Sequence, residues 1–166
     1  MNKNFIYGIA AVQFGNATIG YIEKGSWEWG GTKPETTDVE AEQVPDAPVL
    51  VLQQKNGQIS PTFNLIQLDY ENLQRVLGGT LVTTGEGQNA TVTGWKAPTS
   101  LVEKSGSWTI DFVSGQTMTI PNGALFANLG GKLTLTEVSK VECQLKVMKP
   151  TNGGAPYEIN DTPTEG

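Results

Sequence analysis

The pattern of apolar and polar positions changes its period between residues 57 and 79. Apolar and small polar residues alternate from Gln58 to Leu65, which predicts a strand with one apolar face and one polar face. From Asp69 onwards the apolar positions follow a helical period, and Asp69 and Gly78 are residue types that suit the two ends of a helix. The pattern therefore predicts a strand that leads into one short helix.

The two predicted elements place their side chains on defined faces. The apolar residues Phe63 and Leu65 of the strand are expected to pack under the helix. The small polar residues of the same strand are expected on its opposite face, and they are Ser60, Thr62 and Asn64. The helix is expected to pack through an apolar stripe and a hydrophobic staple, formed by Leu68, Leu73, Val76 and Leu77.

An acidic strand and an apolar strand precede this segment. Residues alternate from Thr36 to Glu42, which places three carboxylates on one face, those of Asp38, Glu40 and Glu42. A proline-bracketed connection that contains Asp46 follows. The next run, Val49–Leu52, is apolar on both faces, and a strand of this kind must be covered twice. The sequence leaves two candidates for the second cover, namely the helix or a neighbouring subunit.

The composition supports a mainly β fold in one domain. The chain has 166 residues, with 20 glycines, 9 prolines and only 17% charged residues, a balance that favours short strands joined by turns over a helical bundle. We expect a β-sandwich or barrel with one short packed α-helix over residues 1–149. Residues 150–166 are rich in Thr, Asn, Gly and Pro, and are expected to form a flexible polar tail.

Several kinds of chemistry are disfavoured. The chain has no histidine, which removes His-based catalysis and His metal ligands. Its single cysteine, Cys143, lies on the apolar face of an expected strand with Val141, Leu145 and Val147, and is expected to be a packed thiol. The net charge of −6 and the lack of a Lys/Arg cluster argue against a protein that grips nucleic acid. No apolar run approaches the length of a membrane span. We therefore expect no enzyme activity, no cofactor or metal, and no membrane partner.

The order of the segments resembles that of the major tail proteins, which build the tail tube of long-tailed bacteriophages. The resemblance covers most of the chain. Its clearest part is a Phe-x-Leu strand before a helix that reads Glu-Asn-Leu-x-x-x-Leu-Gly, with the acidic strand upstream. Downstream, three further expected strands follow in the same order, over residues 108–112, 118–124 and 131–138. The pair Trp27 and Trp29 and the polar C-terminal segment depart from the family.

The resemblance implies a virion structural protein that polymerises as stacked hexameric rings. Its partners would be further copies of the chain and other tail proteins, with DNA passing through the tube without specific binding. Assembly would take place in the bacterial host cytoplasm, and the product would lie in the virion tail. The loop that docks on the next ring is expected to include Thr36, Asp38, Glu40, Glu42 and Asp46. The residues expected to line the lumen are Ser60, Thr62 and Asn64.

Three alternatives remain. The tube protein of type VI secretion shares the architecture of the phage family. A carbohydrate-binding β-sandwich is a second alternative, because Trp27 and Trp29 lie two apart on an expected strand and can form a flat stacking platform for sugar rings. A glycoside hydrolase is disfavoured, because any β protein of this charge offers carboxylate pairs such as those among Asp38, Glu40, Glu42 and Asp111, and the sequence gives no separation between them.

Overall fold

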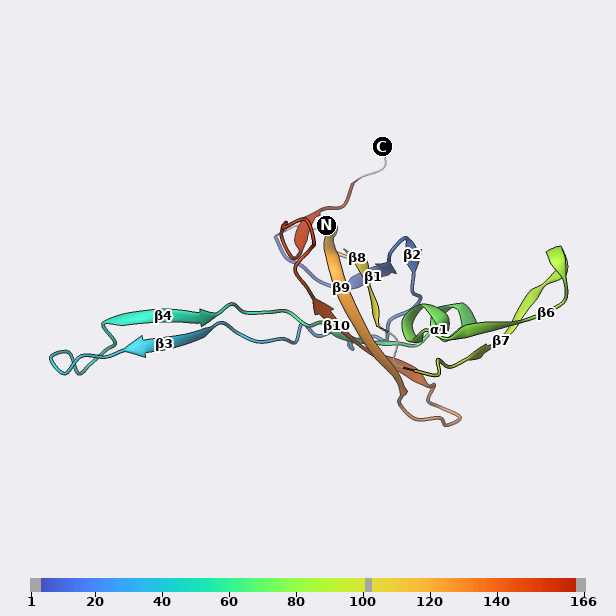
Figure 1. Cartoon of the computed structure of the whole chain (residues 1–166), viewed down its shortest axis with the longest axis horizontal. Helices are drawn as coiled ribbons and strands as arrows, with labels where there is room; N and C mark the ends of the chain where they lie inside the picture. The colour runs from blue at the N-terminus through green and yellow to red at the C-terminus, as the bar shows by residue number, and fades with distance from the viewer. Residues whose placement is uncertain (1–3, 101–102, 164–166) are drawn as a thin grey trace.

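The computed structural model describes residues 4–100 and 103–163, and it is mainly β, with 48% strand and one short α-helix (Figure 1). All strand pairs are antiparallel, and in these residues the sheets do not close into a barrel. The expected mainly β fold with one short helix is confirmed. No helix in this part of the chain is long and apolar enough to cross a membrane.

One sheet of seven strands forms the body of the molecule, in the order β2-β1-β8-β9-β10-β5, with β11 paired to β9 beside this path. Its strands are β1 Ile9–Phe14, β2 Ala17–Thr18, β5 Thr62–Leu65, β8 Lys104–Phe112, β9 Gln116–Gly130, β10 Lys140–Val147 and β11 Glu158–Asp161. Strand β9 has 15 residues, so β11 and β10 can share one of its edges in succession while β8 occupies the other.

Alternation along these strands directs one face of the sheet into the core. The side chains that β8, β9 and β10 contribute to the core cluster are Trp108, Ile110, Phe112, Met118, Ile120, Leu125, Val141, Cys143 and Leu145. The indole N–H of Trp108 donates a hydrogen bond to the carbonyl of Gly123 at 3.2 Å, so this large buried side chain has its polar atom satisfied. The opposite surface carries the intervening polar residues, and we call it the polar face.

The segment after β2 connects the two outer edges of the sheet. The Ile19 N–H donates to the carbonyl of Val12 in β1, and shortly afterwards the Glu23 N–H donates to the carbonyl of Asn64 in β5. The chain then continues beside β5 and forms an isolated bridge between Glu28 and Thr62. The sheet is therefore curved enough for one short segment to reach from β1 to β5.

Helix α1 (Tyr70–Leu77) covers part of the core. The carboxylate of Asp69 accepts the backbone N–H of Asn72 at 2.9 Å, and Gly78 ends the helix with a φ of 81°. Val76 is buried in the core cluster, and the other expected packing residues are partly buried against it, namely Leu68, Leu73 and Leu77. Sequence reasoning therefore placed the helix, both its ends and its packing stripe correctly.

Two hairpins project from opposite sides of this body (Figure 1). One pairs β3 (Glu35–Val39) with β4 (Leu50–Lys55), and we call it the arm. The other pairs β6 (Thr80–Thr84) with β7 (Thr91–Lys96), and it holds the short 3₁₀ helix η1 (Gly87–Asn89) at its turn. Each hairpin is a separate two-stranded sheet.

Two expectations for the second half of the chain are corrected. The strand expected over residues 131–138 is a loop, because the Thr134 hydroxyl accepts the backbone N–H groups of Thr136 and Glu137 and closes a local turn. Within the segment expected to be a flexible tail, β11 pairs with β9 in register from Glu158 to Asp161. The part of the β9 edge that β10 leaves open explains this pairing, since backbone groups of a polar strand can fill it.

Candidate functional site

The two strands of the arm are exposed along their whole length. Every residue of β3 and β4 is exposed, and the arm extends away from the main sheet (Figure 1). The apolar run Val49–Leu52, expected to be covered twice, is between 49% and 54% exposed. The helix does not cover this run, so the expectation that the helix buries its second face is wrong. A contiguous exposed apolar strand of this kind is typical of interaction surfaces in other proteins.

The residues expected in an inter-ring loop all lie on the arm or its turn. Thr36 and Asp38 belong to β3, and Glu40, Glu42 and Asp46 lie in the exposed connection to β4. Asp38 pairs in register with Val51, so a carboxylate stands beside the apolar run. No ion pair engages these four carboxylates among the described residues. The arm therefore presents an apolar strand next to unpaired negative charge.

The base of the arm is fixed by close backbone contacts. Gly30 and Gly31 have φ values of 53° and 83°, and a Cβ at Gly31 would clash with the carbonyl oxygen of Gln58. Thr32 and Gln58 exchange two backbone hydrogen bonds of 3.0 and 2.9 Å at this point. Glycine is required here because the chain combines a left-handed conformation with this close approach. The arm thus leaves the body at a defined position.

The residues expected to line a lumen lie on the polar face. Thr62 and Asn64 alternate with the buried Phe63 and Leu65, and Ser60 precedes them; all three are half-buried. Register places Thr62 opposite Gln144 and Asn64 opposite Glu142 of β10. The Gln144 amide also donates to the Ser60 hydroxyl at 3.3 Å. The three residues are therefore part of one continuous polar surface, which extends over β10.

A charged cluster stands at one end of this surface. The Lys140 ammonium lies 2.6 Å from Glu23, and the Asn64 amide donates to the same carboxylate at 3.3 Å. These two contacts, with Lys140 the stronger, lower the pKa of Glu23 below its ordinary value. The cluster ties the segment after β2 to strands β5 and β10. Sequence reasoning missed it because the two charged residues are 117 positions apart.

The remaining part of the polar face could have been found from the sequence. Glu142, Gln144 and Lys146 alternate with buried apolar residues in β10. That alternation is the signal that identified the buried position of Cys143, and it also assigns the intervening residues to the opposite face. Lys146 lies over the Phe126 ring of β9, with its nitrogen 5.6 Å from the centroid.

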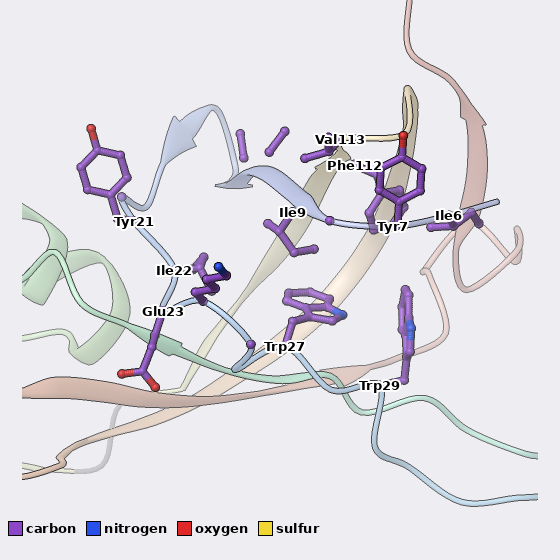
Figure 2. A pocket seen from close by; sticks show the side chains of 16 residues that line it. Ile6, Tyr7, Ile9, Tyr21, Ile22, Glu23, Trp27, Trp29, Phe112 and Val113 are labelled. Carbon is purple, nitrogen blue, oxygen red and sulfur yellow. The ribbon is translucent and has the colours of Figure 1, made fainter. Parts of the chain in front are cut away.

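The two tryptophans do not form a flat platform. Their rings are 5.8 Å apart and nearly perpendicular, at 88°, while Trp27 stacks on the buried Phe63. The indole nitrogen of Trp27 is buried, has no hydrogen-bond partner among the described residues, and points toward the Trp29 ring (Figure 2). This edge-to-face arrangement sets the positive edge of one indole against the face of the other. The geometric premise of a sugar-stacking platform is therefore wrong.

The tryptophans instead form one wall of an apolar groove of about 560 Å³ (Figure 2). The groove lies between β1 and the segment 20–29, and Ile9 and Phe112 contribute to its lining. On the groove side, β1 pairs with β2 only at Gln13 and Phe14. Among the described residues, the part of this edge from Ile9 to Ala11 has no strand partner. The groove is therefore bounded by an open strand edge.

Cys143 is a packed thiol, as expected. It is buried on the core face of β10, and burial raises its pKa to about 12. A thiol with this pKa stays protonated at neutral pH and is not a nucleophile. Within residues 4–100 and 103–163, no group of three His, Cys, Asp or Glu side chains is placed to hold a metal ion.

No family model matches the chain, and no curated protein matches its sequence.

Proposed function

We propose that the chain is a structural subunit that polymerises as stacked hexameric rings into a bacteriophage tail tube, through which DNA passes without specific binding. The ring size, the role in a virion tail and assembly in the host cytoplasm are taken from the resemblance in segment order. Other tail proteins would contact the ends of the tube. The tube protein of a secretion system is the nearest variant of this proposal.

The exposed arm carries the proposal. A hairpin with four consecutive apolar residues about half exposed, Val49–Leu52, is an aggregation hazard for a monomer unless a specific partner covers it. A second copy of the chain is a partner that every molecule has available. An arm that docks on a different surface of the next copy makes a head-to-tail contact, and such contacts generate rings or open helical assemblies.

The polar face supports the assignment of a lumen. It is formed by residues such as Thr62, Asn64 and Gln144. Of the lysines that β10 places on this face, Lys140 is engaged by Glu23 and Lys146 lies over the Phe126 ring. Phosphate-binding proteins instead gather unpaired Lys and Arg side chains, because release of counterions supplies most of their affinity for DNA. A wall of amides and hydroxyls, on which the carboxylates of Glu23 and Glu142 balance Lys140 and Lys146, lets DNA move without retaining it.

Negative-stain electron microscopy of the concentrated chain, with light-scattering mass on the same sample, tests the proposal. We expect rings or hollow tubes, and a mass that rises in multiples of the subunit. A band-shift assay with duplex DNA at physiological salt should show no binding by the dissociated subunit. A uniform monomer at every concentration, with neither rings nor tubes, would count against the proposed function.

A further inference from the structure

The open edge of β1 has the features of a site for strand addition. Ile9, Ala10 and Ala11 line a groove, and no described strand pairs with them on the β2 side of β1. The walls of the groove are apolar and aromatic, and include Trp27 and Trp29 (Figure 2). An extended peptide that adds to such an edge gains main-chain hydrogen bonds, and its alternate side chains fill the adjoining pocket. The groove therefore fits an extended apolar strand.

The charge at the rim of the groove restricts the occupant further. Lys24 lies on the lining and forms no ion pair among the described residues, whereas the neighbouring Glu23 is neutralised by Lys140. The rim thus carries one free positive charge beside an apolar floor. An apolar strand that is accompanied by carboxylates would match both features.

The chain itself contains a strand of this description. Strand β4 exposes Leu50, Val51 and Leu52, and its edge away from β3 has no partner among the described residues. Asp38 stands next to Val51 in the arm, and Glu40 follows shortly after in the sequence. The strand and the groove are therefore complementary in backbone, polarity and charge.

The arm does not occupy the groove of its own molecule. It leaves the body at the glycine pair after Trp29 and extends away from the sheet (Figure 1). The complementary surfaces thus lie at separate places on each molecule. Such a contact between two copies is head-to-tail, and leaves one arm and one groove free for the next subunit.

We propose that β4 of one copy adds as a strand to the open β1 edge of a second copy, with its apolar side chains in the groove beside Trp27 and Trp29. This inference rests on the proposed function, because it identifies the surface that receives the arm during assembly. It assigns the tryptophan pair a role as part of a docking site for another subunit.

Cysteine cross-linking of the full chain tests the contact. Ala10→Cys places a thiol at the exposed open edge, and Leu50→Cys, Val51→Cys and Leu52→Cys place one at successive arm positions. Each arm variant is mixed with Ala10→Cys, oxidised mildly and analysed by non-reducing electrophoresis. The native Cys143 is buried and does not interfere. Thr84→Cys, on the exposed β6–β7 hairpin, is the matched control partner for Ala10→Cys.

We expect the yield of cross-linked dimer to alternate from one position to the next along the arm strand. Side chains alternate across a strand, so the Leu50 and Leu52 variants should behave alike and differ from Val51. The arm variants on the face that meets Ala10 should give roughly ten times more cross-linked dimer than the Thr84 control, because docking raises the local thiol concentration. Equal yields at all three arm positions would overturn strand addition. Rings or tubes by microscopy without any arm cross-link would overturn this docking site and leave the proposed function standing.

A different result would support the docking site on β1 and count against the tail-tube function. Cross-linking with the expected period, in a sample that microscopy shows to contain only irregular oligomers, would support the docking site and count against a ring-forming tube. Absence of both cross-links and assemblies would overturn both proposals.

Discussion

Trp27 stacks on Phe63, with their ring centroids 5.2 Å apart and 16° between the ring planes. Phe63 belongs to β5 and is buried, whereas Trp27 belongs to the segment that connects the two edges of the sheet. The stack therefore fastens this segment to the core. It also fixes the wall of the groove, because the buried indole N–H of Trp27 points toward the Trp29 ring, in an edge-to-face contact of the two indoles (Figure 2). Stability and the proposed docking site share this one contact.

The loss of stability on replacement should be larger for Trp27 than for Trp29. Trp27→Ala removes the stack on Phe63 and should lower the free energy of unfolding by about 3 kcal/mol. Trp29→Ala should cost only about 1 kcal/mol, because the side chain is 40% exposed. Urea unfolding followed by circular dichroism measures both changes without dependence on indole emission. Equal losses for the two variants would contradict the structural role given to Trp27.

The N-terminus of α1 depends on one carboxylate. Asp69→Ala leaves the backbone N–H of Asn72 without its acceptor and should lower the free energy of unfolding by about 1 kcal/mol. Asp69→Asn retains an acceptor oxygen at the same place and should recover most of that loss. Urea denaturation of the three proteins provides the comparison. If Asn destabilises the protein as much as Ala, the cap does not act through this hydrogen bond.

Cys143 should make stability depend on alkaline pH. Burial raises its pKa from 9.0 to about 12, so between these values the folded state keeps a proton that the unfolded state loses. The contribution of this group is therefore complete below pH 9 and declines as pH rises to 12. Its slope is at most about 1.4 kcal/mol per pH unit.

The variant Cys143→Ala isolates this contribution from those of tyrosine and lysine. The difference in unfolding free energy between the native chain and the variant should narrow from pH 9 toward pH 12. The thiol of the folded protein should also resist a disulfide reagent at pH 8 and react fully in urea. A constant difference across the alkaline range would show that the thiol is not the titrating group.

Local patterns made α1 predictable from the sequence, and also β5, which is the second half of the strand expected from Gln58 to Leu65. Asp69, Gly78 and the alternation around Phe63 each act through neighbours a few residues away, and their effects are visible in any short window. The burial of Cys143 followed from the same alternation in β10. These features need no knowledge of how distant segments meet.

The groove and the exposed arm could not be predicted in the same way. The pairing of Glu23 with Lys140 and the open edge at Ala10 both depend on how the sheet curves. The run Val49–Leu52 reads as a buried strand, because its composition reports only that it needs cover and not which molecule supplies it. For this reason, an apolar strand that another molecule covers has the same composition as a strand buried in the core.

Charge reversal on the arm should impair assembly without affecting the fold. Glu40 and Glu42 lie in the exposed connection between β3 and β4. Substitution of both by Lys would place positive charge near Lys24 of the docking groove and should slow assembly roughly tenfold at low salt. The effect should diminish as salt screens exposed charges. Light scattering after a concentration jump gives the rate, and circular dichroism reports the fold.

Two further variants separate this local effect from a general effect of net charge. The pair Glu86→Lys and Glu137→Lys changes the net charge by the same amount at exposed positions outside the arm, and should assemble at close to the native rate. Adding Lys24→Glu to the arm variant restores opposite charges across the proposed contact and should recover much of the lost rate. Equal slowing by the control pair, or no recovery with Lys24→Glu, would show that charge complementarity with Lys24 does not contribute to docking.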